Sequence, residues 1–513
     1  MEPRSKLERL VPWALAFIAL VRAWPYFFFS PDDYYIYLRF VQNFVEHGEL
    51  SFNPGEPTYG FTSALWLLVL GAAAKVTGNA LLAGKVISLV ASATSPVLLY
   101  FVMRRLTGVT GLSFLAGLVW AGNAWLVRWS ASGLEAGLSA TLALAVVLFA
   151  MRARERGTAP WGAGITVGLV PFVRPEMIGL TILFAVFWFL TDPATGAVRR
   201  RNVIATIVPP ALILGGGLSG LYLHFGRIFP NTAEAKGAMV HGLAKLIPSV
   251  ERQLKIVAST SALEMGLFGV AAVVWLYRGR WRGLWERRDP AFVLLMTAWS
   301  LGVIGLYGVR GVNVYTRYLL MFMPFVVIGG FAPLVAWWRR GGRRQSAVLV
   351  IGAVALVQNT VLDFRVIRPA TIAYQESEQR VNIAIGEWLR DNTAPGTVIA
   401  VPDIGAIGYV SQREILDLNG LITPELIPYK RNKEINRFLE ENPPQFIISI
   451  DPDPKWLETN GPDLPLVLVM SLPFEKMFIF QDEPLYYSLY RVLPAVEVPT
   501  DWIARFSSVE SWE

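Results

Sequence analysis

The chain has 513 residues, of which 54% are hydrophobic and 17% charged, and its mean hydropathy is +0.44. Soluble globular chains carry about 25% charged residues. This composition therefore excludes a soluble enzyme, a disordered chain and a nucleic-acid-binding domain, and predicts a polytopic α-helical membrane protein. The chain has no Cys and three His, which excludes disulfides and Cys-ligated zinc and argues against a multi-histidine metal site.

The charges divide the chain into two parts. Residues 364–513 hold 13 Lys and Arg against 22 Asp and Glu, a net charge of −9, whereas the remaining residues have a net charge of +16. A basic apolar part followed by an acidic, less apolar part is typical of two domains. We predict a transmembrane domain over residues 1–363 and a soluble domain over residues 364–513.

Apolar stretches of membrane-spanning length recur up to about residue 362. The basic start of the chain precedes an apolar run without an A-x-A site, so we expect an uncleaved first helix. The stretch 161–190 is broken by Arg174-Pro175-Glu176 and is expected to form two short helices that meet at a polar corner. The other expected spans are 10–29, 81–103, 110–128, 133–151, 203–225, 259–277, 290–309, 318–337 and 345–362.

The basic runs indicate the orientation in the membrane, because cytoplasmic loops are enriched in Lys and Arg. If 61–77 crosses and 161–190 is one helix, two of the runs, Arg104-Arg105 and 152–156, fall outside. If 61–77 does not cross and 161–190 crosses twice, all runs fall on the side of the N-terminus. We adopt the second arrangement, with about eleven crossings, a cytoplasmic N-terminus, and an extracytoplasmic C-terminal domain in a plasma or inner membrane. The segments then placed outside are 30–60, 129–135, 174–176, 226–258, 310–317 and the tail.

The tail alternates helical and strand patterns. An amphipathic helix is expected at 375–391, and strands at 397–401, 445–450 and 486–492. Pro and Gly separate these segments. This order predicts a small α/β domain.

Two adjacent carboxylates, Asp32 and Asp33, follow the first apolar helix. A helix that begins near Pro31 would place both in its first turn, where the helix dipole favours acidic residues, so a purely structural helix start is one interpretation. The surrounding aromatic residues and the polar loop 53–60 favour another, in which a carboxylate at the membrane surface is the general base for a hydroxyl group.

Several short motifs occur in the order found in one enzyme superfamily. The first outer loop, from Asp32-Asp33 through Arg39-Phe40, His47-Gly48 and Phe52 to Glu56 into Tyr59 to Ser63, resembles that of bacterial GT-C-type glycosyltransferases, and especially the mycobacterial terminal arabinofuranosyltransferase-like proteins. The further matches are Ser132 to Glu135, Arg174 to Glu176, Phe229 to Thr232 with Lys236, Asp403 to Tyr409, and Asp417 to Leu421.

The resemblance implies an enzyme that transfers a sugar from a polyprenyl-phosphate carrier to a glycan or lipid acceptor of the cell envelope on the outer side. An acidic residue of the first loop would be the catalytic base, here Asp33 or Asp32. Asp33 fits the spacing to His47-Gly48 better. The sequence departs from the pattern at Tyr34-Tyr35, where relatives usually have a small residue first, and this could change acceptor fit. Arabinofuranose is one candidate for the sugar.

Other outer residues are candidates for substrate contacts. Cations on the departing phosphate would stabilise its growing charge, although interfacial snorkelling is the structural alternative. Glu135 and Glu176 could orient sugar hydroxyls or form a structural ion pair with Arg174. Asn231 and Tyr59 are expected to bind substrate. The candidate phosphate ligands are Arg174, Arg317, Lys236 and Arg310.

These motifs identify no definite cofactor and leave a requirement for a divalent metal open. Two adjacent Asp residues would permit a divalent metal, but such a site would need further ligands. The expected partners are the lipid-linked donor, the acceptor and membrane lipids, with no nucleic acid. A lipid-linked sugar flippase or transporter, which would need polar groups at mid-membrane, and a non-catalytic envelope scaffold are the competing hypotheses.

Overall fold

The computed structural model describes residues 6–237, 242–278, 291–311, 314–479, 481 and 483–493. Contacts divide the chain into two compact units, each made of three segments. The helical unit consists of Met1–Phe29, Thr62–Ile228 and Met239–Arg368. The mixed unit consists of Ser30–Phe61, Phe229–Ala238 and Pro369–Glu513. The first loop and the tail therefore belong to one compact unit.

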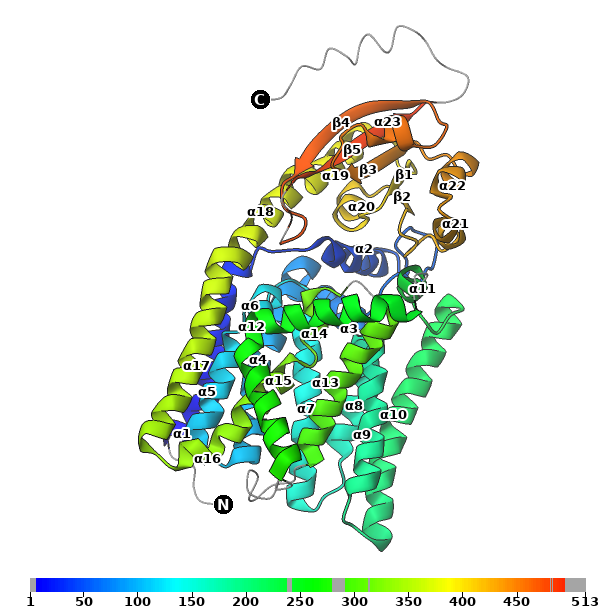
Figure 1. The fold of residues 1–513 in the computed structure, drawn as a ribbon. Coiled ribbons are helices and arrows are strands. Elements are labelled where there is room, and N and C mark those ends of the chain that lie inside the picture. Colours follow the sequence, from blue (N-terminus) through cyan, green and yellow to red (C-terminus); the bar gives the residue numbers. More distant parts are fainter. Residues whose placement is uncertain are drawn as a thin grey trace. The chain divides into compact units, whose positions relative to one another are not determined.

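The helical unit is built from long apolar helices and short connecting helices (Figure 1). Its α-helices are α1 (Lys6–Ala23), α3 (Ala64–Thr77), α4 (Ala80–Thr107), α5 (Thr110–Ala121), α6 (Ala124–Trp129), α7 (Ala136–Arg156), α8 (Trp161–Val173), α9 (Ile178–Thr191), α10 (Gly196–Phe225), α12 (Gly242–Arg278), α13 (Ala291–Arg310), α14 (Thr316–Leu319), α15 (Met323–Phe331), α16 (Val335–Arg339) and α17 (Gly342–Leu362). Four short 3-10 or π segments accompany them: η1 (Trp24–Tyr26), η2 (Pro175–Met177), η3 (Ala332–Leu334) and the π-helix η4 (Asp363–Ile367).

Six helical stretches of the described part are long and apolar enough to cross a membrane: Ala80–Thr107, Ala136–Arg156, Gly196–Phe225, Leu246–Val273, Ala291–Arg310 and Gly342–Asn392. Five shorter apolar stretches have 10–17 residues, among them α3, α5 and α8. A hydrocarbon core of about 30 Å needs roughly 20 helical residues. The chain is thus a polytopic α-helical membrane protein, while the expectation of about eleven crossings stays a prediction.

The expected break at 174–176 is confirmed. Helix α8 ends at Val173, Arg174 has extended backbone angles, and α9 begins at Ile178 after the 3-10 turn η2. Pro175 stands in the first position of that turn, where its missing N–H costs nothing. Because Pro disfavours helical angles in the residue before it, the two helices cannot join into one.

Three expected spans end or divide earlier than hydropathy suggested. In the stretch 10–29 the α-helix ends at Ala23, and the 3-10 turn η1 follows with Pro25 as its second residue. The stretch 110–128 stops at Ala121, and Asn123 starts α6 by accepting the backbone N–H groups of Trp125 and Leu126, each at 3.2 Å. The stretch 318–337 is divided among α14, α15, η3 and α16. Side-chain capping and proline, which hydropathy ignores, decide these boundaries.

The mixed unit contains a five-stranded sheet with helices packed on it. Its strands are β1 (Val398–Val401), β2 (Glu414–Asp417), β3 (Phe446–Asp451), β4 (Leu466–Phe474) and β5 (Leu485–Val492), in the order β2-β1-β3-β5-β4. β1 pairs in parallel with β2 and β3, whereas β3 with β5 and β5 with β4 are antiparallel. The helices are α2 (Asp32–Glu46), α11 (Asn231–Gly237), α18 (Arg368–Glu378), α19 (Ala384–Asn392), α20 (Gly405–Ser411), α21 (Leu426–Asn432), α22 (Ile435–Glu441), α23 (Trp456–Asn460) and the π-helix η5 (Gln379–Ile383).

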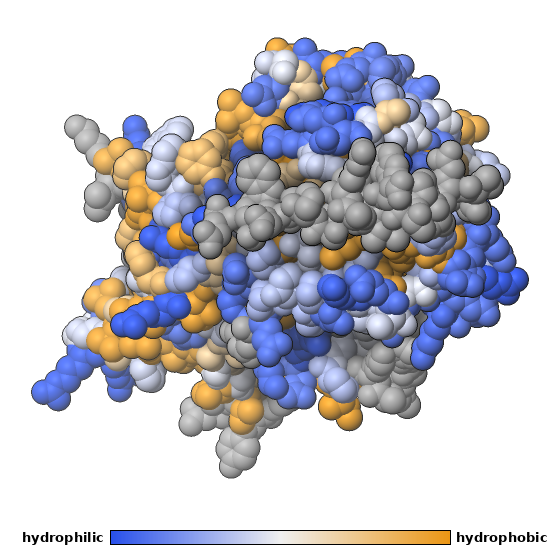
Figure 2. Space-filling model, turned by 90° about the horizontal axis from the view of Figure 1, so that it is seen from above, coloured by the Kyte–Doolittle hydropathy of each residue, from blue (hydrophilic) through white to orange (hydrophobic). Residues whose placement is uncertain are grey.

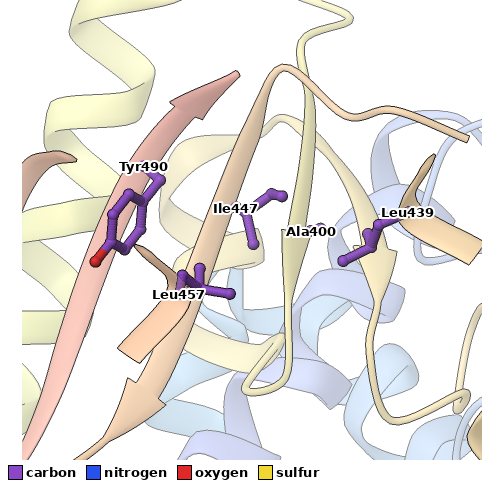
Figure 3. Packing of buried hydrophobic residues seen from close by; sticks show 5 residues of the cluster. All are labelled: Ala400, Leu439, Ile447, Leu457 and Tyr490. Atoms are coloured by element: carbon purple, nitrogen blue, oxygen red, sulfur yellow. The ribbon is translucent and has the colours of Figure 1, made fainter. Parts of the chain in front are cut away.

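The three predicted strands of the tail are confirmed as β1, β3 and β5, and the expected helix at 375–391 is covered by α18, η5 and α19. One core cluster of the sheet consists of Ala400, Leu439, Ile447, Leu457 and Tyr490, which lie between the strands and the helices α22 and α23 (Figure 3). Burial of such apolar side chains stabilises the domain by about 25 cal/mol per Å².

The surface seen in Figure 2 carries both hydrophilic side chains and hydrophobic patches. In the helical unit, the long helices expose large apolar side chains, for example Leu212 on α10, Val270 on α12 and Val357 on α17. Monomeric soluble proteins rarely expose extended apolar surfaces. These faces are therefore expected to contact lipid.

Candidate active-site residues

Asp32 in the mixed unit is held by backbone groups of a distant segment. Its Oδ1 accepts the N–H of Ala406 at 2.7 Å and its Oδ2 accepts the N–H of Gly405 at 3.0 Å. The N–H of Asp32 in turn donates to the hydroxyl of Tyr374 at 3.1 Å. A Cβ atom on Gly405 would lie 2.0 Å from the carbonyl oxygen of Asp32, so only glycine permits this approach. Asp32 thus fixes the start of α2 against the first turn of α20.

Three further acidic residues surround this anchor. Asp403 accepts the hydroxyl of Tyr487 at 2.5 Å. Glu378 is buried, and one of its oxygens accepts Asn382 Nδ2 at 3.0 Å. Burial is the main reason that the pKa of Asp32 lies well above its usual value, and repulsion from Asp403 raises the pKa further. The two backbone N–H donors lower the pKa but do not cancel this rise.

Asp33 contributes to the same electrostatic environment. Its charge raises the pKa of both Asp32 and Asp403, although burial is the larger cause at each. Asp33 is the second residue of α2 and is partly exposed. Since both oxygens of Asp32 are engaged by backbone amides, Asp33 is the better candidate for a base that must contact a substrate hydroxyl.

The rest of the first loop is organised by two asparagine side chains. Asn43 Nδ2 donates to the carbonyl oxygens of Ser51 and Phe52, both at 2.9 Å. Asn53 accepts the N–H of Ile415 at 3.0 Å and donates to its carbonyl oxygen at 2.9 Å, which extends the pairing of β2. The loop is therefore shaped by the C-terminal sheet.

Tyr59 and Asn231, both predicted to bind substrate, are buried in the mixed unit. The N–H of Asn231 donates to the carbonyl oxygen of Tyr59 at 2.9 Å, and Asn231 Nδ2 donates to that of Leu421 at 3.1 Å. These bonds connect three segments of the unit. A contact with substrate stays a prediction for both residues.

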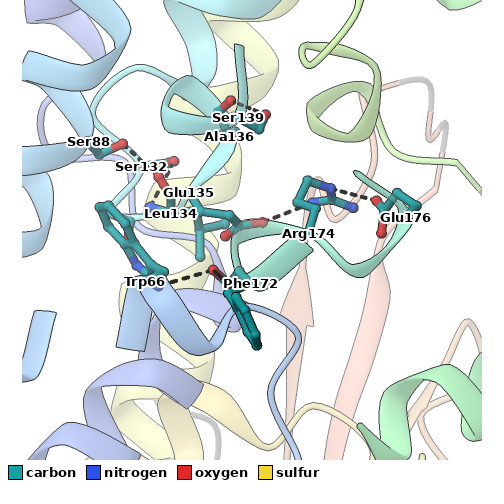
Figure 4. Close-up of polar contacts among 12 residues, drawn as sticks. Trp66, Ser88, Ser132, Leu134, Glu135, Ala136, Ser139, Phe172, Arg174 and Glu176 are labelled. Carbon is teal, nitrogen blue, oxygen red and sulfur yellow. Dashed lines mark hydrogen bonds and ion pairs between the residues drawn. The ribbon is translucent and has the colours of Figure 1, made fainter. Parts of the chain in front are cut away.

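Arg174 in the helical unit lies between two carboxylates (Figure 4). Its Nη1 is 2.9 Å from Glu135 Oε1, its Nε is 2.7 Å from Glu176 Oε1, and its guanidinium carbon lies 4.2 Å from the ring centre of Tyr318. Tyr307 donates its hydroxyl to Glu176. Because two carboxylates already neutralise Arg174, this geometry favours the structural ion pair over a phosphate contact.

Arg317 has a different environment, in which its guanidinium packs against three aromatic rings. It is buried on α14, 5.2 Å from the ring centre of Trp129, 5.3 Å from that of Tyr318 and 5.4 Å from that of Tyr315. Trp129 Nε1 donates to Thr316 at 2.8 Å, which joins α6 to α14. Cation–π attraction holds a guanidinium group that packs against aromatic rings, and its planar fork suits bidentate contact with phosphate.

Two cations that the sequence did not single out lie beside this group. Arg128 on α6 is 4.7 Å from the ring centre of Trp129 and 5.1 Å from that of Phe29. Lys85 on α4 is buried and donates to the carbonyl oxygens of Phe29 at 2.8 Å and Ala131 at 3.5 Å. We call Lys85, Arg128 and Arg317 the cation group. The residues Gly122-Asn123 could have indicated Arg128 in the sequence. They end one helix and begin another, so Arg128 lies in a separate short helix.

The other two predicted phosphate ligands are less enclosed or less defined. Arg310 is exposed at the end of α13. Lys236 belongs to α11, but its side chain lies outside the described residues. Among the residues that the structure describes, no group of three or more His, Cys, Asp or Glu is arranged to hold a metal ion.

The chain is similar to a domain family over part of its length and to solved structures over most of it. Residues 368–504 match a family described as Domain of unknown function (DUF8728). No curated protein matches the sequence. Several solved structures share the fold at low sequence identity, and two of them illustrate it.

The first is the oligosaccharyltransferase AglB from Archaeoglobus fulgidus, in complex with an inhibitory peptide and a dolichol-phosphate, with a TM-score of 0.58 and 13% identity over 88% of this chain and 70% of AglB. The second is ArnT from Cupriavidus metallidurans bound to undecaprenyl phosphate, with a TM-score of 0.55 and 12% identity over 93% of this chain and 97% of ArnT. The chain has the GT-C fold, with a small C-terminal sheet domain.

Proposed function

We propose that this protein is a membrane glycosyltransferase that moves a sugar from a polyprenyl-phosphate donor to a glycan or lipid acceptor of the cell envelope on the outer face. The acidic pair at the start of α2 supports the proposal. Asp32 is bound by backbone N–H groups of Gly405 and Ala406, and the adjacent carboxylate of Asp33 is suited to general-base chemistry. The GT-C fold supports a lipid-linked donor, since AglB is described with dolichol-phosphate and ArnT with undecaprenyl phosphate.

In the proposed reaction, Asp33 accepts the proton of an acceptor hydroxyl while that oxygen attacks the anomeric carbon of the donor sugar. The bond between the anomeric carbon and the phosphate oxygen breaks, and polyprenyl phosphate leaves with the bonding electrons. A positioned base of this kind contributes about 10²- to 10⁴-fold in rate. Asp32 keeps Asp33 in place through its bonds to Gly405 and Ala406.

The leaving phosphate gains negative charge and requires cations. We assign this role to the cation group of the helical unit, with Arg317 and Arg128 as the main ligands. Both guanidinium groups lie close to the indole ring of Trp129, at 4.7 Å for Arg128 and 5.2 Å for Arg317, and this shared neighbour supports the assignment. Arg174 is assigned to hold Glu135 and Glu176 in place.

The test is incubation of the purified full chain with a panel of radiolabelled polyprenyl-phosphate sugars, beginning with arabinofuranose, and with envelope glycan and lipid acceptors. Transfer by the natural sequence, loss of transfer in Asp33→Asn, and normal transfer in Asp453→Asn are the expected results. Asp453 is an exposed carboxylate of the same unit, so it controls for charge loss alone. Movement of the lipid-linked sugar across a vesicle membrane without transfer would instead indicate a flippase, and full transfer by Asp33→Asn would refute the base.

A further inference from the structure

One end of the helical unit holds an arginine cluster that the proposed reaction does not use. Asp363 is fully buried at the start of the π-helix η4. It accepts Arg22 Nη2 at 3.1 Å and the hydroxyl of Tyr26, and lies 3.6 Å from Arg368 Nη2. We call Arg22, Asp363 and Arg368, together with the exposed Arg365 two positions after Asp363 in η4, the Asp363 cluster.

The cluster has more positive charge than its carboxylate can balance. One carboxylate faces two arginines, and Arg365 adds a third, exposed guanidinium within the same π-helix. Each guanidinium has five N–H donors. The Nε atoms of Arg22 and Arg368 are buried and have no hydrogen-bond partner among the described residues. The side chains are nevertheless 20% and 25% exposed, so their outer N–H groups can reach an added anion.

The chain segments that carry the cluster also expose aromatic side chains. Trp24 and Phe28 are each 67% exposed, and Phe364 is 50% exposed. The Arg368 guanidinium lies 4.1 Å from the ring centre of Phe364. Exposed aromatic rings at the ends of apolar helices are typical of the membrane–water interface. An anion that binds here would therefore reach the cluster from the lipid surface.

The position along the helices is also unusual for arginine. The start of α1 lies beside a basic run, because Glu8 pairs with Arg104 at 2.9 Å. The Asp363 cluster lies at the other end of α1 and follows the last residue of α17. The positive-inside tendency depletes Lys and Arg from one end of a bundle, so three arginines opposite the basic runs need another reason. Irregular π-helical turns such as η4 are frequent at functional sites.

We propose that the Asp363 cluster binds the phosphate headgroup of an anionic glycerophospholipid at the membrane surface. Guanidinium groups bind phosphate oxygens through paired N–H donors, and the aromatic rings would contact the glycerol and the first methylenes of the acyl chains. This inference does not depend on the glycosyl transfer proposed above.

The test is native mass spectrometry of the purified full chain with added phosphatidylglycerol or phosphatidylcholine of equal acyl chains. We expect phosphatidylglycerol to bind about fivefold or more tightly, because choline neutralises the phosphate charge of the other lipid. Arg365→Gln and Arg368→Gln are each expected to weaken phosphatidylglycerol binding about fivefold. Both variants leave Asp363 paired with Arg22, so folding is preserved.

Arg104→Gln is the matched control, since it removes one arginine from an ion pair at the other end of α1, and its lipid binding is expected to be unchanged. Equal binding of the two lipids, or equal losses in Arg104→Gln and Arg368→Gln, would overturn the proposal. Competition by millimolar inorganic phosphate alone would indicate a site for soluble anions, and displacement by polyprenyl phosphate at equal concentration would indicate a carrier site. Either result would also overturn it.

Discussion

The carboxylate of Asp32 accepts the backbone N–H of Ala406 at 2.7 Å, across 374 positions of sequence. A second bond to Gly405 completes the contact. The candidate base Asp33 follows in the chain, so the tail defines the position of the first loop. Gly405 and Ala406 lie within residues 368–504, which match DUF8728, so this segment contacts the residue that precedes the proposed base.

Separate substitutions of the two adjacent carboxylates should have different effects. Asp32→Asn replaces one accepting oxygen with an NH₂ group and removes the negative charge that faces two backbone N–H donors. Hydrogen bonds to charged groups contribute about 1.5–3 kcal/mol each. We expect its melting temperature to fall by several degrees and its activity to fall with it. Asp33→Asn is expected to keep the melting temperature and to lose transfer by about 10²-fold or more.

Thermal melts and single-time-point transfer assays on both variants check this pair of outcomes. If Asp32→Asn is stable but inactive while Asp33→Asn is active, then Asp32 is the catalytic base and Asp33 is not.

Substitutions of Arg174 and Arg317 should also have different effects. Arg174→Gln leaves two buried carboxylates, Glu135 and Glu176, without their cation, and breaking a buried pair costs about 3–5 kcal/mol. We expect this variant to be poorly folded. Arg317→Gln removes a cation that lies over aromatic rings, and is expected to fold and to show a raised KM for the lipid-linked donor.

Size-exclusion profiles, melting temperatures and donor titrations measure these differences. Arg317→Lys is the conservative control, because it retains the charge and loses the planar donors. An Arg174→Gln protein that folds normally and fails only in donor binding would restore Arg174 as a phosphate ligand.

Glu264 is a buried carboxyl within the apolar stretch Leu246–Val273. Within the described part of the chain, neither of its side-chain oxygens has a hydrogen-bond partner. Burial of an uncompensated polar group costs about 1–3 kcal/mol by mutational measures. Glu264→Leu is therefore expected to raise the melting temperature by several degrees.

The control for this substitution is Glu251→Gln on the same helix, an exposed carboxylate paired with Lys255 at 2.6 Å. Exposed pairs contribute little, so its melting temperature should stay within error. A lower melting temperature in Glu264→Leu would mean that the carboxyl makes a stabilising contact.

Asp417, at the end of β2, should make the stability of the protein depend on pH. Burial raises the pKa of Asp417 to about 6, although the backbone N–H groups of Asn419, Ile422 and Leu421 oppose this shift. The unfolded value is about 3.9. The folded state therefore binds the proton more tightly, and the contribution of this group to stability is lost as the pH rises from about 4 to about 6.

The measurement is the free energy of unfolding of the natural sequence and of Asp417→Asn between pH 4 and pH 7. The difference between the two proteins isolates this group from the other carboxylates. We expect the stability of the natural sequence, relative to Asp417→Asn, to decrease across this window and to be constant above about pH 6. Parallel curves would contradict the raised pKa.

The sequence predicted the strands that lie inside the sheet better than those at its edges. β1, β3 and β5 are interior strands and appear in the sequence as short apolar runs. β2 and β4 are the two edge strands, and β4 is half-buried along most of its length and carries Pro473. An edge strand buries less surface and tolerates Pro, so its pattern is weaker.

The sequence by itself determined the membrane class, the helix break at Arg174-Pro175-Glu176 and the acidic pair after the first helix. These features depend on local composition and on backbone restrictions, which act over a few residues. The tertiary structure alone decided that Arg174 is enclosed by Glu135 and Glu176, that Arg128 accompanies Arg317, and that Asp32 is bound by Gly405 and Ala406. Hydrogen bonds and ion pairs depend on distances of about 3 Å between groups, and segments far apart in the chain reach such distances only once it has folded.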